Sequence, residues 1–83
     1  MKHIEYPCSG TCSKAICLDL DDELRVHNVQ FVGGCSGNTQ GVSSLVENMS
    51  ARDVIARLGG IRCGYKVTSC PDQLSRALSS SIA

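Results

Sequence analysis

The sequence predicts an α+β domain, with a small antiparallel sheet of about three strands followed by two to three helices on one face. In residues 14–20 and 24–32, apolar and polar residues alternate, as in strands that have one buried face. Beyond the glycine-rich stretch 33–38 (GGCSGN), apolar residues recur at the spacing of amphipathic helices. A chain of 83 residues is expected to form one domain, spanning residues 1–83.

The strands are expected before the glycines, at Lys2–Tyr6, Lys14–Leu20 and Leu24–Val32. In the second, Ile16, Leu18 and Leu20 share one face and are predicted to line the core. Acidic residues 21–23 form the turn to the third strand. There the alternation changes phase between Val26 and Val29, which predicts a β-bulge near His27–Asn28.

Two helices are expected after the glycine-rich stretch. Asn38 or Thr39 can cap the first, and its inward face is predicted from four apolar residues at helical spacing, Val42, Leu45, Val46 and Met49. The second begins with a capping-box pattern, Ser50 to Asp53, and Gly59 is expected to stop it as the residue after its end. Its apolar residues are Val54, Ile55 and Leu58.

The last helix is expected to begin at Pro71 and to face the core with Leu74, Ala77 and Leu78, while the tail 79–83 frays. Because proline suits the first helical position, Cys70 is predicted to be the N-cap. A thiolate there would be stabilised by the helix N-terminus. The alternative is that Ser69 or Thr68 caps the helix and that Cys70 packs against the protein.

Charge and composition exclude several function classes. Eight basic and eight acidic residues give a formal net charge of zero, so nucleic-acid binding has no electrostatic basis. No apolar run is long enough to span a membrane, and the first residues do not resemble a secretory signal. A cytoplasmic protein is therefore expected, in which six cysteines indicate metal binding or thiol chemistry rather than disulfides.

Four cysteines form the strongest candidate site, because each lies in a loop or at an element boundary beside a small residue. They are Cys12, Cys35, Cys63 and Cys70. Four thiolates with steric clearance suit zinc or an iron–sulfur cluster, and the sequence does not choose between the two. Reduced core thiols and a dithiol redox pair remain as alternatives.

The other candidates are weaker. Cys17 lies in mid-strand and is expected to be a small hydrophobic residue, whereas the role of Cys8 is open. His3 and His27 are expected to be surface residues rather than extra ligands. No nucleophile–base arrangement can be argued from the sequence, which favours a non-enzymatic role.

Three segments of the chain, FVGGCSGNTQG, IRCGYK and TSCPDQL, closely resemble the TSCPD-domain family, and the resemblance covers nearly the whole chain. It implies a small metal-binding domain whose characteristic cysteines are Cys12, Cys35, Cys63 and Cys70. Relatives occur at the C-terminal end of cobalamin-dependent ribonucleotide reductases, which implies such a reductase as a protein partner. The chain is too short to hold that enzyme's catalytic barrel.

A more distant likeness is to iron–sulfur scaffolds of the IscU type. They also place strands first, then a cysteine loop entering a serine-rich helix, then a last cysteine opening the final helix. Cys12, Cys35 and Cys70 would occupy comparable places, whereas Cys63 is an addition and Ser13 stands where the scaffolds have an aspartate. The likeness implies an IscU-like fold.

Three hypotheses follow. The leading one is a cytoplasmic accessory domain that binds zinc or an iron–sulfur centre through the four cysteines. The second is a thiol redox or sulfur-relay module of a ribonucleotide reductase, with Cys63 and Cys70 as the exchanging pair. The third is a structural domain with buried thiols, which could form a homodimer through the 24–32 strand edge.

Overall fold

The computed structural model of the chain describes residues 1–10, 13–33, 36–62, 64–65 and 68–82. Three strands come first and three helices follow, as the sequence predicts for an α+β domain. The elements are β1 (Lys2–Pro7), β2 (Ser13–Leu20), β3 (Val26–Gly33), α1 (Ser36–Val46), α2 (Ala51–Leu58) and α3 (Cys70–Ile82). In the described ranges, no helix has the length and apolar character needed to cross a bilayer.

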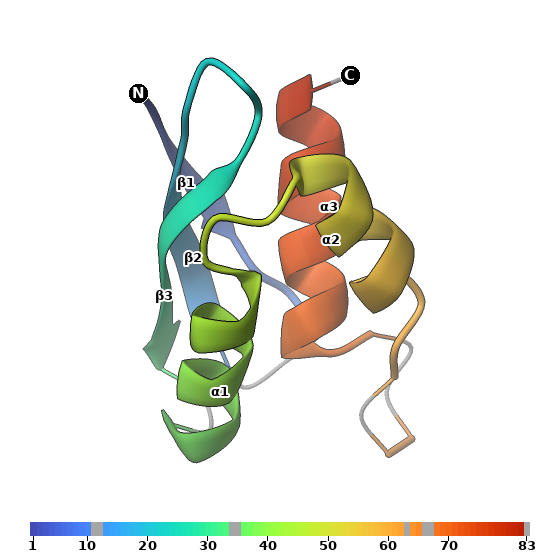
Figure 1. The fold of residues 1–83 in the computed structure, drawn as a ribbon. Coiled ribbons are helices and arrows are strands. Elements are labelled where there is room, and N and C mark those ends of the chain that lie inside the picture. Colours follow the sequence, from blue (N-terminus) through green and yellow to red (C-terminus); the bar gives the residue numbers. More distant parts are fainter. Residues whose placement is uncertain (11–12, 34–35, 63, 66–67, 83) are drawn as a thin grey trace.

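The strands form one antiparallel sheet in the order β1-β2-β3, and the helices cover one of its faces (Figure 1). Ile4 pairs with Leu18, and both side chains are buried beneath the helices. Their strand neighbours point to the opposite, open face, because side chains alternate along a strand. β3 ends, and α1 and α3 begin, at the same lower end of the molecule in Figure 1.

The predicted bulge in β3 is confirmed. Cys17 pairs with Gln30 whereas Asp19 pairs with His27, so β3 carries one extra residue over this interval. Asn28 lies in the extra stretch with a φ of 56°, in the left-handed region that asparagine tolerates better than most residues. The bulge restores the inward direction of Val29, which is buried.

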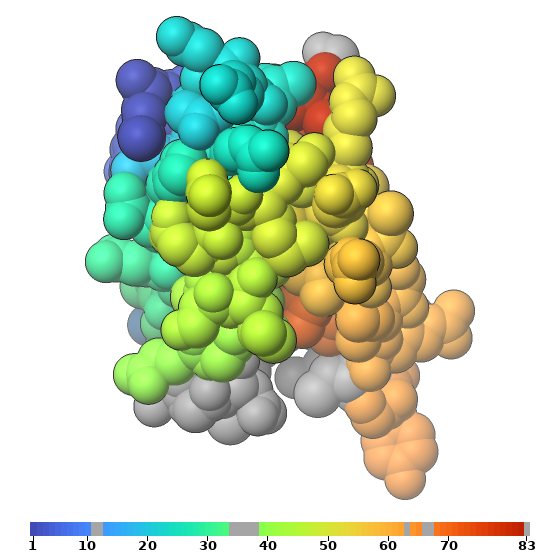
Figure 2. Space-filling model, viewed as in Figure 1, coloured from blue at the N-terminus to red at the C-terminus, as the bar shows by residue number. Residues whose placement is uncertain are grey.

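The core joins the inner face of the sheet to α3 and α2. The strand residues predicted to line it are almost completely buried, as are the three predicted residues of α3, Leu74, Ala77 and Leu78. In the space-filling view of Figure 2, α1 and α2 hide much of α3, parts of which show between them and at the top of the view. α3 is therefore the central helix of the layer.

The prediction for the inward face of α1 was partly wrong. The helix begins at Ser36, so positions 38 and 39 lie within it rather than at its N-cap position. Its inner side contains Thr39 and Val46, which are both buried, whereas Leu45 is 78% exposed. A step of one residue turns a helix by about 100°, so Leu45 points away from a face that contains Val46. Met49 lies beyond the helix and still packs against the core.

The predicted ends of α2 also differ from the structure. Ser50 occupies the N-cap position, but its side chain makes no capping hydrogen bond. Its backbone instead forms a β-bridge with Arg25. At the other end, Gly59 has a φ of −63°, and Gly60 is the residue with positive φ. Gly59 is needed for space, because an added Cβ would lie 2.8 Å from the Ile55 carbonyl oxygen.

The C-terminal residues extend α3 rather than fray, since the helix continues to Ile82. Ile82 packs against the core, which compensates for the entropy lost on ordering this last turn. The prediction of a frayed tail was wrong for residues 79–82.

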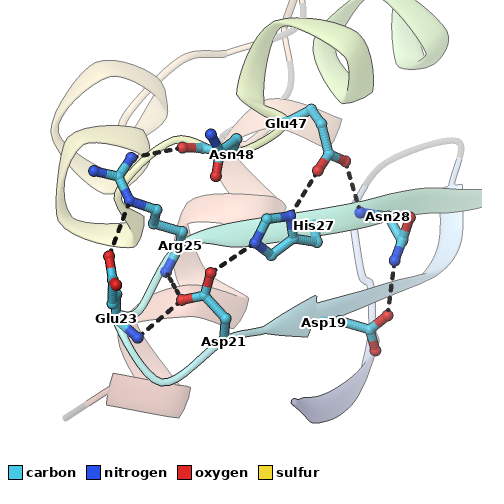
Figure 3. Close-up of polar contacts among 8 residues, drawn as sticks. All are labelled: Asp19, Asp21, Glu23, Arg25, His27, Asn28, Glu47 and Asn48. Atoms are coloured by element: carbon cyan, nitrogen blue, oxygen red, sulfur yellow. Dashed lines mark hydrogen bonds and ion pairs between the residues drawn. The ribbon is translucent and has the colours of Figure 1, made fainter.

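His27 links the turn before β3 to the segment after α1 (Figure 3). Its Nε2 lies 2.8 Å from an Asp21 carboxylate oxygen, and its Nδ1 lies 2.7 Å from Glu47. Two acidic partners raise the pKa of His27, first through the hydrogen bond to Asp21 and then through that to Glu47. The imidazolium form can donate to both carboxylates at once.

Candidate functional site at the start of α3

The first turn of α3 is capped by Ser69, which corrects the prediction that Cys70 is the N-cap. The backbone N–H of Asp72 donates to Ser69 Oγ at 3.1 Å, and the N–H of Gln73 donates to the Ser69 carbonyl oxygen. Cys70 is consequently the first helical residue, and Pro71 is the second. The alternative of a serine cap was the right one. Proline fits either register, because the first N–H groups of a helix have no intrahelical acceptor.

Asp72 organises the polar surroundings of this turn. It is nearly buried, and one carboxylate oxygen accepts the Gly60 N–H at 2.7 Å. The other accepts the hydroxyl of Thr68 and the Nε–H of Arg76. Burial alone would raise the pKa of Asp72, but the bonds from Thr68 and Gly60 and the charge of Arg76 outweigh it and lower that pKa. The carboxylate is therefore used to join the chain before α3 to the helix.

Two further contacts tie loops to the same turn. The hydroxyl of Ser69 donates to the carbonyl oxygen of Ile61 at 2.7 Å. Gln73 accepts the backbone N–H of Ser9 through Oε1, and its Nε2 donates to Thr68 Oγ1. The loop after β1 and the connector after α2 are thus both hydrogen-bonded to residues 68–73. The sequence reasoning named Thr68 only as a possible cap, and it missed Gln73, whose partner Ser9 is distant along the chain.

The half-buried thiol of Cys70 lies against β2. Its Sγ is 2.9 Å from the hydroxyl oxygen of Ser13, the first residue of that strand. Cys8 lies close enough to Cys70 for an electrostatic interaction between the two thiol groups. Burial, and to a smaller extent the charge of Cys70, raise the pKa of Cys8 to about 11, so Cys8 is a neutral thiol near pH 7.

Of the four predicted metal ligands, Cys70 is the one whose position the structure describes. Cys12, Cys35 and Cys63 lie outside the described residues. Residues one or two positions from each of them are described, however. Ser13 follows Cys12 directly and contacts Cys70.

The neighbours of the other two cysteines lie at the same end of the molecule. Gly33, two residues before Cys35, pairs with Ser13 across β2 and β3. Ile61, two residues before Cys63, is bonded to Ser69. The three segments that carry the predicted ligands are therefore anchored around the first residues of α3.

The comparisons with known proteins give one match. The family model described as the TSCPD domain matches residues 2–82. Neither the curated proteins nor the solved structures contain a match to the chain, so the likeness to IscU-type scaffolds stays a prediction.

Proposed function

Because this chain belongs to the TSCPD-domain family, we propose that it is a small accessory domain that binds zinc or an iron–sulfur centre. The ligands would be Cys12, Cys35, Cys63 and Cys70. The observation that carries the proposal is the anchoring of Ser13, Gly33 and Ile61 around the start of α3.

Covalent reach connects these anchors to the cysteines. Consecutive Cα atoms are about 3.8 Å apart, so a residue one or two positions from an anchor can lie within about 8 Å of it. Four sulfurs around one zinc ion each lie about 2.3 Å from the metal. Each loop therefore needs only a short span of chain between its anchor and a shared metal ion.

The position of Cys70 supports ligation in a second way. The N–H groups and the macrodipole of a helix N-terminus stabilise negative charge, which favours the thiolate that a metal requires. The Ser13 hydroxyl at 2.9 Å can donate to that thiolate. Asp72 does not oppose this arrangement, because its carboxylate is bonded to Gly60, Thr68 and Arg76.

The test is metal analysis and absorbance of protein purified without oxygen. We expect at least one zinc ion per chain, or iron with the colour of a cluster. Cys70→Ser should lower the metal content strongly, since serine keeps the size of the side chain and removes the sulfur. His27→Gln, which removes a potential ligand that does not belong to the four-cysteine site and is hydrogen-bonded to Asp21 and Glu47, is the control and should keep the metal.

Metal-free wild-type protein would overturn the proposal, and so would unchanged metal content in Cys70→Ser. A fold check by far-UV circular dichroism separates loss of metal from loss of structure. If the protein is metal-free and Cys70 titrates well below the usual thiol pKa of about 8.5, thiol exchange replaces metal binding as the better proposal. In that role Cys63 and Cys70 would exchange with a disulfide of a partner such as ribonucleotide reductase.

A further inference from the structure

A second cluster of metal-ligating side chains lies on the open face of the sheet, away from the core. His3 and Glu5 are two residues apart on β1, so their side chains point to the same face. Across the strand pair, Glu5 faces Cys17 and His3 faces Asp19. Four side chains from two strands therefore form a compact polar group.

The geometry of this group points to a metal site, and we propose that His3, Glu5 and Cys17 bind zinc. A ring nitrogen of His3, a carboxylate oxygen of Glu5 and the sulfur of Cys17 all lie within 4.8 Å of one another. Zinc bond lengths of about 2.0–2.3 Å place tetrahedral ligand atoms about 3.3–3.7 Å apart. Small side-chain rotations would close the remaining gap, because His3 and Glu5 are exposed and free of core packing.

Asp19 acts as a positioning residue for His3. The Nδ1 of His3 lies 2.8 Å from Asp19 Oδ1. The other oxygen of Asp19 accepts a hydrogen bond from the side-chain amide of Asn28 at 3.1 Å, which Figure 3 shows. Asn28 is itself held in place, because its backbone N–H donates a hydrogen bond to a carboxylate oxygen of Glu47. A carboxylate that accepts a hydrogen bond from the Nδ1–H group orients the ring and leaves Nε2 as the ligand atom. This arrangement is common in zinc sites.

The contact between His3 and Glu5 supports the same conclusion. His3 Nε2 lies 3.2 Å from Glu5 Oε2. When the ring is neutral and its Nδ1–H donates to Asp19, the Nε2 lone pair faces the Glu5 carboxylate. Two acceptors then face each other, which is unfavourable. A proton on Nε2 removes the conflict, as in His27, and a metal ion that replaces this proton removes it equally.

The ligand types suit zinc, which accepts imidazole, carboxylate and thiolate in the same site. Three protein ligands leave a fourth position, which faces solvent and can take water. This site shares no ligand with the four-cysteine site proposed above, so the two proposals can fail independently.

The test uses Co²⁺ as a spectroscopic probe of the whole chain and Zn²⁺ in NMR titrations. In the Cys70→Ser background, Co²⁺ should produce a sulfur-to-cobalt charge-transfer band that disappears with Cys17→Ser and with His3→Gln. His27→Gln is the matched control, because His27 also lies between two carboxylates, and it should leave the band unchanged. In wild-type protein, Zn²⁺ should shift the His3 ring nitrogens and the Cys17 Cβ.

Asp19→Asn should weaken Co²⁺ binding by about 10- to 100-fold without abolishing the band, as expected for a partner of a ligating histidine. Equal Co²⁺ affinity in the His3→Gln and His27→Gln proteins would overturn the proposal. So would His3 resonances that do not move when Zn²⁺ is added to wild-type protein, a measurement that does not depend on any variant folding.

Discussion

The substitution Asp72→Asn tests whether the buried carboxylate holds the loops to α3. The side chain keeps its size but has one acceptor oxygen instead of two. In the wild-type protein, one oxygen accepts from Gly60 and the other from Thr68 and Arg76. The single amide oxygen of asparagine can accept either from Gly60 or from Thr68 and Arg76, but not from both groups of donors. If the amide nitrogen faces Thr68, the Thr68 oxygen can accept from it as well as from Gln73, but the Thr68 O–H then loses the Asp72 oxygen as its acceptor.

The expected loss of stability is the sum of two effects. Losing one charge-assisted hydrogen bond costs about 1.5–3 kcal/mol. Removing a negative charge from the first turn of a helix costs about 0.3–1 kcal/mol more. The bond from Arg76 adds little, since that side chain is 54% exposed and can turn to water. The free energy of unfolding should therefore fall by about 2–4 kcal/mol.

Asp53→Asn is the matched control, because Asp53 lies in the first turn of α2 and is exposed. It loses the helix-dipole interaction alone, about 0.3–1 kcal/mol. Both proteins should be unfolded with urea near pH 7 and followed by far-UV circular dichroism, with a chelator present so that bound metal does not contribute. If the two substitutions cost the same, Asp72 does not hold the loops, and the reasoning about this network is refuted.

Two further predictions concern the core and pH. Leu78→Ala, at a fully buried position of α3, should lower the free energy of unfolding by about 2–5 kcal/mol. Leu45→Ala, at a 78% exposed position, should change it by less than about 0.5 kcal/mol; similar losses at both positions in urea melts would contradict the described core. Asp21 and Glu47 raise the pKa of His27 in the folded protein. The contribution of protonated His27 to the free energy of unfolding should therefore be complete below about pH 6.5, and it should be lost as the pH rises through the folded-state pKa. With a chelator present, the wild-type urea midpoint should decrease as the pH rises above about 6.5. His27→Gln should remove more of this fall than His3→Gln, since the side chains are 17% and 57% exposed, and an unchanged slope in His27→Gln would contradict the assignment.

Local pattern was sufficient to predict the sheet. The alternation of Ile16, Leu18 and Leu20 identified the buried face, and the phase change after Val26 located the bulge. Both signals lie within a few residues of the feature that they predict, because the strand period is a local property. The periodicity of α3 identified its buried side for the same reason.

Helix boundaries were harder to predict, because the same residues are compatible with more than one starting position of the helix. Pro71 is compatible with the first or second helical position, so it could not decide between Cys70 and Ser69 as the cap. For α1, the face was predicted from apolar residues alone. The structure also buries Thr39, which such a pattern does not include.

The long-range polar contacts around the start of α3 could not be predicted from sequence, because the residues that make them are distant along the chain. Ser9 and Gln73 are 64 residues apart, and Ser13 and Cys70 are 57 apart. No local spacing encodes such pairs. The cysteines could be proposed as a set only from their loop positions and from the family resemblance.

The way these loops are held bears on what they do. Apolar burial is non-directional and tolerates small shifts of one segment against another. Hydrogen bonds constrain both distance and angle. The loop after β1 and the connector after α2 are fixed to α3 by Gln73, Asp72 and Ser69, through directional bonds to backbone groups. A domain that only needed to bury thiols would gain little from such positioning, whereas a metal site requires its ligands to be placed within a fraction of an ångström. The polar residues around Cys70 therefore favour the metal-binding proposal over the structural one.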